Sequence, residues 1–241
     1  MIAAAPAIIS AMTMLMSCKA QLYCTFSHVA ESERLSAKTN RTQVLSYTTK
    51  ELPDQVILPV QFTSQAPTGH WGIPYNEACE EASLAMVQHY LKNISNNVLA
   101  ADVEIKKILQ WENDNGYGID VSAQQTLTIA QNVYGLKGTV YYGEDVTVTK
   151  IKELLAQGHP LIVPVAGQDL NNPNFRNGGP PYHMLVITGY DANNFITNEP
   201  GTSRGASYKY PKDVLFNALH DWAGSKANAR NGKKALLALG M

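Results

Sequence analysis

Apolar residues recur at helical spacing through the first half of the region that follows the N-terminal segment. Between residues 101 and 112 the apolar side chains repeat every three or four positions, and the turn residues Asn113-Asp114-Asn115-Gly116 end the pattern. Three other segments show comparable apolar faces bounded by turn or cap residues. We therefore predict helices over residues 77–92, 101–112, 122–134 and 147–157.

The second half of the chain contains short apolar runs separated by turn residues. Such runs are typical of buried β-strands. A helix is predicted over residues 211–222, between the last two runs. Because helices come first and antiparallel strands follow, this order predicts an α+β fold with N-terminal helices packed on a C-terminal antiparallel sheet. The predicted strands cover residues 56–60, 160–165, 183–191, 195–198, 207–210 and 234–239.

The N-terminal segment differs in character from the rest of the chain. Its first 17 residues carry no charge and include an apolar run of the length of a secretory h-region, too short and interrupted for a membrane span. Leu15-Met16-Ser17-Cys18 matches a bacterial lipobox, although an ordinary signal peptide explains the same pattern. We divide the chain into a signal peptide or lipoprotein leader (1–24), a polar tether (25–54) and one folded domain (55–241). This organisation predicts a secreted or cell-surface protein of bacterial type. A lipid anchor at Cys18 would be its only membrane contact, and an ordinary signal peptide would leave it with none.

Composition narrows the range of functions. The 241 residues are 45% hydrophobic, and the formal net charge is −1, so the chain has no electrostatic feature that favours nucleic acid or an anionic membrane. The sequence contains neither a phosphate-binding glycine loop nor a metal-spaced Cys/His cluster. We therefore expect a monomer that needs no metal or organic cofactor.

Cys79 is the only cysteine beyond the leader, which holds Cys18 and Cys24. A disulfide within the domain is therefore excluded. Cys79 lies on the first turn of the first predicted helix, whose terminal partial charge favours a thiolate by about 0.3–1 kcal/mol. His183 opens an apolar strand about a hundred residues later, and a contacting imidazolium can lower a cysteine pKa to about 3–4. Either residue alone is more often part of a packed core, but together they indicate a nucleophilic site.

Carboxylates next to Cys79 act against a thiolate. Glu77, Glu80 and Glu81 lie within two residues of it, and a nearby anion raises the pKa of a thiol. The same residues suit a helix N-terminus, which gives them a purely structural explanation. We therefore expect the imidazolium of His183 to supply the larger, opposite effect.

Four sequence blocks occur in the order Pro59–Gln65 with Trp71, Ala78–Ser83, Tyr182–Asp191 and Asn198–Thr202. Together they resemble the C-39-like cysteine peptidases, a papain-like group that includes the bacteriocin-processing double-glycine peptidases. The resemblance covers about residues 56–210. It implies a papain-like fold and hydrolysis of a peptide or protein substrate through an acyl-enzyme.

The resemblance implies roles for individual residues. Cys79 is the nucleophile, and His183 is the general base and acid. The third member in the family is typically the acidic residue before a proline, here Glu199, which we favour. Asn198 is the alternative, because papain uses an amide in this role and adjacent strand residues point to opposite faces. Gln65 is the implied oxyanion-hole donor.

The chain departs from the family pattern at two positions. Gln65 lies farther from Cys79 than the family's glutamine commonly does, so residues 66–75 would have to loop out. Glu80 stands where many members carry glycine, which would reshape access to the thiol.

The loop over residues 171–181 leads directly into the His183 strand. Its glycines and prolines indicate a surface path that could run over the cleft, where Phe175 and Arg176 would contact substrate. A connecting loop without substrate contact is the alternative.

Taken together, the residues predict a thiol hydrolase with a Cys-His-Glu or Cys-His-Asn triad. Two alternatives remain at this point. One is a catalytically inactive papain-like surface binding module, and the other is a thiol acyltransferase or cell-wall amidase, because one triad serves transfer and hydrolysis alike.

Overall fold

An antiparallel sheet of seven strands organises the part of the chain that the computed structural model describes, residues 51–240. Its strands follow the order β2-β7-β3-β4-β5-β6, and β1 pairs with the end of β4. The strands are β1 (Val56–Ile57), β2 (Gly138–Tyr142), β3 (Leu161–Val165), β4 (His183–Tyr190), β5 (Asn194–Asn198), β6 (Tyr208–Pro211) and β7 (Ala235–Leu239).

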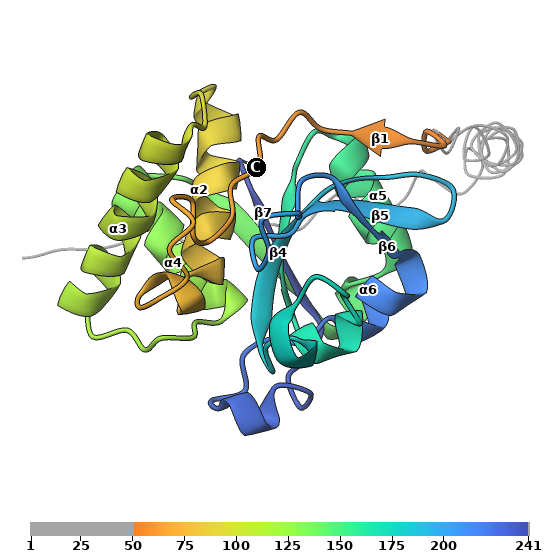
Figure 1. The fold of residues 1–241 in the computed structure, drawn as a ribbon. Coiled ribbons are helices and arrows are strands. Elements are labelled where there is room, and N and C mark those ends of the chain that lie inside the picture. The colour runs from red at the N-terminus through yellow and green to blue at the C-terminus, as the bar shows by residue number, and fades with distance from the viewer. Residues whose placement is uncertain (1–50, 241) are drawn as a thin grey trace, which may run out of the picture. The chain divides into compact units, whose positions relative to one another are not determined.

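Helices cover both faces of this sheet (Figure 1). One layer holds α2 (Cys79–Lys92), α3 (Val98–Asp114) and α4 (Ala123–Tyr134), and α5 (Val148–Ala156) and α6 (Lys212–Ala218) pack on the other face. Short 3-10 helices occupy the connections. They are η1 (Tyr75–Glu77), η2 (Gly143–Asp145), η3 (Gly167–Leu170), η4 (Arg176–Gly178) and η5 (Lys226–Asn228).

The central strands are buried on both faces, which explains their uninterrupted apolar sequences. Side chains alternate across the sheet, so Ile162 of β3 and Val186 of β4 pack with α2, α3 and α4. Their neighbours Val163 and Leu185 pack with α5 and α6. Each face of the sheet thus has its own hydrophobic core, and β4 lies between them.

Local sequence signals set both ends of α4, whereas α2 begins at the candidate site without a side-chain cap. Ser122 and Gln125 form a reciprocal capping box at the start of α4, and Gly135 ends that helix with φ 66°. The N-cap of α2 is Ala78, whose side chain cannot accept a hydrogen bond. The first turn of α2 therefore lacks a side-chain cap, and it begins at Cys79.

The predicted α+β class is confirmed, while several element boundaries were wrong. Strand β2 was not predicted, because it lies between two helices in the sequence and only its pairing with β7 defines it. The first strand spans only Val56–Ile57, since Pro59 has no N–H to continue a ladder. The last helix ends at Ala218 rather than at residue 222.

The leader prediction lies outside the described residues, including Cys18 and Cys24, as does the tether except for residues 51–54. Among residues 51–240, none of the helices combines the length and the apolar character needed to cross a bilayer.

Candidate active site

Cys79 is the first residue of α2 and is buried, with 6% of its surface exposed. The N–H groups of the first helical turn have no intrahelical acceptor, and they carry the positive end of the helix dipole. Because Ala78 offers no cap, this positive end acts on the thiol without a competing side-chain oxygen at the N-cap.

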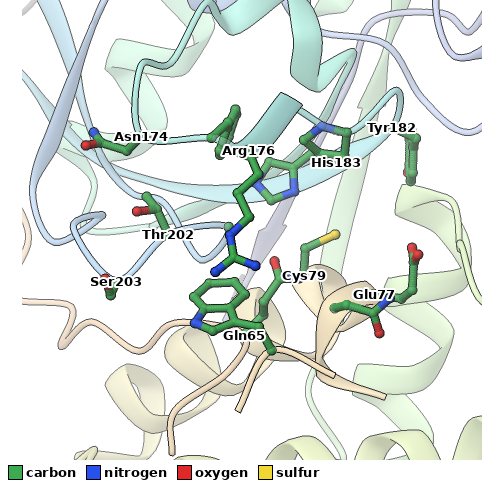
Figure 2. A pocket seen from close by; sticks show the side chains of 14 residues that line it. Gln65, Glu77, Cys79, Asn174, Arg176, Tyr182, His183, Thr202 and Ser203 are labelled. Atoms are coloured by element: carbon green, nitrogen blue, oxygen red, sulfur yellow. The ribbon is translucent and has the colours of Figure 1, made fainter. Parts of the chain in front are cut away.

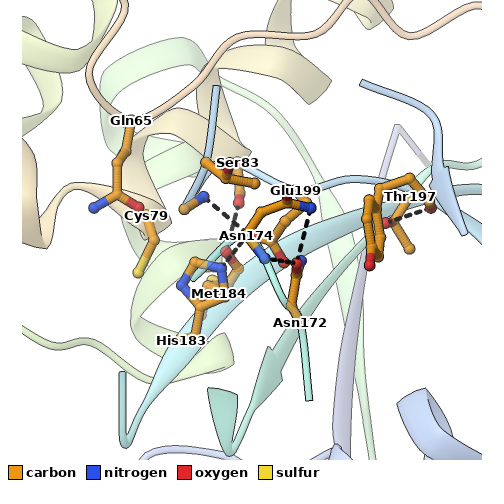
Figure 3. Close-up of polar contacts among 12 residues, drawn as sticks. Gln65, Cys79, Ser83, Asn172, Asn174, His183, Met184, Thr197 and Glu199 are labelled. Carbon is orange, nitrogen blue, oxygen red and sulfur yellow. Dashed lines mark hydrogen bonds and ion pairs between the residues drawn. The ribbon is translucent and has the colours of Figure 1, made fainter. Parts of the chain in front are cut away.

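His183 is the first residue of β4, where it pairs with Val165 of β3. Helix α2 packs directly on β4, and the Ser83 hydroxyl donates to the carbonyl oxygen of Met184 over 3.3 Å. Ser83 lies one turn beyond Cys79, so this hydrogen bond sets the start of the helix beside the start of the strand. Cys79 and His183 consequently face the same space (Figure 3).

Glu199 follows β5 directly and is buried against His183. Its Oε1 lies 2.5 Å from His183 Nε2 and accepts the backbone N–H of Gly201 at 2.8 Å. Asn198 points away, and its side-chain amide donates to the carbonyl of Val60 at 2.9 Å. The structure therefore places Glu199, and not Asn198, against the imidazole, as the pleat of a strand requires of adjacent residues.

Gly201 leaves room beside this pair. A Cβ at this position would lie 3.1 Å from both His183 Cε1 and Glu199 Oε1, and 2.9 Å from the ring of Phe175. The Phe175 ring also meets the His183 imidazole edge to face, with centroids 5.5 Å apart. The imidazole is thus held by a carboxylate and by an aromatic ring.

Gln65 also reaches the site. Its backbone N–H donates to the carbonyl of Pro200 at 2.9 Å, and its side-chain Nε2 donates to the carbonyl of Tyr75 at 2.9 Å. A primary amide carries two hydrogens, so the second remains for another acceptor. Residues 66–75 form the excursion between Gln65 and η1 that the long spacing to Cys79 required.

A pocket of about 320 Å³ opens over these residues (Figure 2). Its walls come from the first turn of α2, the loop around η4 and the segment after Glu199. The lining residues are Gln65, Trp71, Asn76, Glu77, Cys79, Asn174, Phe175, Arg176, Pro180, Tyr182, His183, Gly201, Thr202 and Ser203. Within the described residues, no group of three or more His, Cys, Asp or Glu side chains is arranged to hold a metal ion.

Comparison with family models places the sequence in a known group. The model of the Peptidase_C39 like family matches residues 57–229. The chain belongs to the Peptidase_C39-like family. The predicted resemblance is thereby confirmed, and the chain has a cysteine peptidase fold.

Two solved structures are similar to this family member. A candidate C39-like peptidase from Bacillus anthracis matches with a TM-score of 0.51 and 18% identity, over 77% of this chain and 98% of that one. Xylellain, a cysteine protease from Xylella fastidiosa, matches with a TM-score of 0.39 and 15% identity, over 78% of this chain and 86% of that one. No curated protein matches the sequence. At these identities, the first likeness supports the fold alone.

Two residues that the sequence did not reveal complete the surroundings of Glu199 in this C39-like chain. The Tyr210 hydroxyl donates to Glu199 Oε2 at 3.0 Å, and the Asn172 amide donates to the Tyr210 oxygen at 2.6 Å. Burial, together with Glu199, raises the pKa of Tyr210 well above its ordinary value, so the hydroxyl stays a donor. No local signal could identify Tyr210, because the pairing of β6 with β5 brings it to this place.

The thiol itself contacts Glu80 in this structure. Cys79 Sγ donates to Glu80 Oε2 over 2.9 Å, and Glu80 Oε1 accepts the backbone N–H of Val121 at 3.3 Å. Glu80 is 2% exposed, and its burial raises its pKa to about 8. The sequence predicted that Glu80 disfavours a thiolate and reshapes access to the thiol, but its burial in direct contact with the sulfur is a new feature of the site.

The resting thiol is consequently neutral. Burial raises the pKa of Cys79 well above its ordinary value, and the carboxyl groups of Glu80 and Glu81 raise it further. No hydrogen bond joins Cys79 to His183 within the described part of the chain. The expected lowering of the thiol pKa by His183 is therefore wrong for this resting arrangement, because the sulfur is engaged by Glu80 instead.

Proposed function

We propose that this protein hydrolyses peptide or amide bonds through the thiol of Cys79. The observation that carries the proposal is the buried His183–Glu199 pair, which lies at the same pocket as the thiol. Glu199 occupies Nε2 of the imidazole, so Nδ1 is left for the cysteine. A base oriented by a third group in this way is the common feature of activated nucleophiles.

The reaction starts when the Cys79 side chain turns from Glu80 to His183. His183 Nδ1 accepts the Sγ proton, and the thiolate attacks the substrate carbonyl carbon. The backbone N–H of Cys79 and the second amide hydrogen of Gln65 then donate to the developing oxyanion. The protonated imidazole gives its proton to the leaving amine, which departs and leaves a thioester on Cys79.

Deacylation repeats these steps with water as the nucleophile. His183 takes a proton from water, the hydroxide attacks the thioester carbonyl, and the released sulfur recovers the proton. Glu199 remains bonded to Nε2 of the ring and stabilises the imidazolium that forms twice in each cycle.

The test is cleavage of a fluorogenic peptide library by the full-length protein, with mass spectrometry of the trapped acyl-enzyme. We expect Cys79→Ala to abolish cleavage and His183→Ala to reduce it by several orders of magnitude. His159→Ala is the matched control and should keep full activity, because His159 lies two residues before β3 and does not line the pocket. Product analysis with an added amine acceptor separates hydrolysis from acyl transfer. Cleavage that survives Cys79→Ala would refute the proposal.

A peptide-binding module without turnover is the second candidate. One observation favours it, namely that the thiol is hydrogen-bonded to Glu80 and not to His183. In that case peptides would bind with the same affinity to the wild-type protein and to Cys79→Ala, and no acyl-enzyme would form. Calorimetric titration of both proteins with peptides from the library distinguishes the two candidates.

A further inference from the structure

Arg176 is the only lysine or arginine among the residues that line the pocket. It is exposed, and no carboxylate of the described chain lies within ion-pair distance of its guanidinium. The carboxylate that lines the same pocket, half-buried Glu77, is already paired with Lys226 at 2.6 Å. The pocket therefore presents one uncompensated positive side chain to a substrate.

The backbone that carries Arg176 is anchored to the His183–Glu199 pair. The backbone N–H of Phe175 donates to the carbonyl of Asn172 at 3.1 Å, while its ring packs on His183. Asn172 is buried and is joined to Glu199 through Tyr210. The position of Arg176 relative to the reacting groups is thus set by packing and hydrogen bonds, although the residue lies in a loop.

The surroundings of Arg176 suit an anion. Figure 2 shows its side chain extending over the pocket, with the guanidinium directed to the side where Gln65 and Cys79 lie. Thr202 and Ser203 line the same pocket and add hydroxyl groups. A guanidinium offers paired N–H donors that match the two oxygens of a carboxylate.

We propose that Arg176 selects peptide substrates that carry a carboxylate close to the scissile bond. The carboxylate belongs either to an acidic side chain or to a free C-terminus. This inference rests on the proposed hydrolysis and adds its substrate class. Arg176 acts by binding the substrate, so it sets specificity and takes no part in proton transfer.

The expected effect follows from the exposure of the pair. Exposed ion pairs contribute up to about 1 kcal/mol, which corresponds to about a fivefold difference in kcat/KM. Screening by salt weakens such pairs, so the preference should decline as ionic strength rises. Charge reversal at Arg176 adds repulsion and should invert the preference.

The first experiment compares matched fluorogenic peptides that differ only by Glu, Gln or Lys near the scissile bond, and free-acid with amidated C-termini. We expect the full-length protein to prefer either the Glu peptide over its Gln counterpart, or the free-acid peptide over the amidated one, by about three- to fivefold in kcat/KM. Arg176→Gln should remove that preference, and Arg176→Glu should favour Lys. Arg204→Gln is the matched control, because Arg204 is exposed, forms no ion pair with residues 51–240 and does not line the pocket. Cys79-dependent cleavage without any carboxylate preference, or a preference that persists in Arg176→Gln, would overturn the inference and leave hydrolysis standing.

A second experiment does not depend on turnover. Iodoacetate and iodoacetamide alkylate the same thiol, but only iodoacetate carries a carboxylate. Mass spectrometry of the peptide that contains Cys79 gives both alkylation rates. The rate with iodoacetate divided by the rate with iodoacetamide should fall severalfold in Arg176→Gln and stay unchanged in Arg204→Gln. An unchanged ratio in both variants contradicts the role of Arg176. A lowered ratio without Cys79-dependent cleavage supports that role and contradicts the proposed hydrolysis.

Discussion

Replacing Glu80 by Gln should lower the pKa of the Cys79 thiol. The Sγ–H donates to Glu80 Oε2 over 2.9 Å inside the protein. Because the pKa of Glu80 is raised to about 8 by burial, its carboxyl group is ionised in the alkaline range where the thiol titrates. A thiolate would then form beside an anion, whereas glutamine keeps the size of the side chain and removes the charge.

The magnitude follows from the loss of one charge-assisted hydrogen bond. Such bonds contribute about 1.5–3 kcal/mol, and each 1.36 kcal/mol corresponds to one pH unit. The apparent pKa of Cys79 should therefore fall by roughly one to two units in Glu80→Gln. Burial, the largest cause of the raised pKa, is unchanged, so the value should not reach that of an exposed thiolate–imidazolium pair.

The assay is the rate of iodoacetamide alkylation at Cys79 as a function of pH, followed by mass spectrometry of its peptide in the full-length protein. Glu77→Gln is the matched control, because Glu77 lines the same pocket but pairs with Lys226 rather than with the thiol. We expect the control to titrate as the wild type does. An alkylation pKa that is equal in wild type and Glu80→Gln would refute the reasoning, as would an equal shift in both variants.

Further variants test the remaining contacts of the site and of the buried carboxyl groups. Glu199→Gln should lower kcat by at least about tenfold, because the imidazolium loses its carboxylate partner. Asn198→Ala should instead cost about 1–3 kcal/mol of stability and leave kcat unchanged. Steady-state kinetics and urea unfolding of both variants test the assignment of Glu199 to the imidazole, and an equal loss of kcat in both would contradict it. Gln65→Ala should reduce kcat by about 10²–10³ with little change in KM if its amide serves the oxyanion, and a change in KM alone would contradict that role. Burial raises the pKa values of Glu81 and Glu112, so the folded protein retains protons that the unfolded chain has lost. The stability that these two groups contribute is complete below their pKa in the unfolded chain, about 4.3, and declines as pH rises through their pKa values in the folded protein. Urea unfolding should therefore give a lower free energy of unfolding at higher pH, and this pH dependence should be weaker in Glu81→Gln. A wild-type free energy of unfolding that increases over this range would refute the argument.

Periodicity in the sequence was sufficient to predict the α+β class and most elements of the sheet. Helical spacing of apolar residues and continuous apolar strands are local properties, because each reflects which faces of one element are buried. The pairing of Cys79 with His183 in one site could be predicted for a similar reason, since each residue lies at the start of an element that the sequence pattern reveals. Strand β2 escaped prediction because its pairing with β7 joins segments that lie far apart in the sequence.

The choice between Glu199 and Asn198 needed the tertiary structure. Alternation along a strand says that two neighbours point to opposite faces, but not which of them faces His183. The pairing of β5 with β4 decides that, and it includes a register shift between Ile187 and Gly189. Glu199 consequently contacts the imidazole, and the Asn198 amide instead donates to the carbonyl of Val60.

The electrostatic state of the thiol also depended on packing that the sequence does not display. Glu80 follows Cys79 directly and suits an exposed helix terminus, yet the contact of α2 with Val121 buries it beside the sulfur. A carboxyl group in water and one in a protein interior differ by several pKa units because burial disfavours the charged form. The sequence by itself thus determined which groups are available for chemistry, whereas long-range packing decided their protonation and their partners.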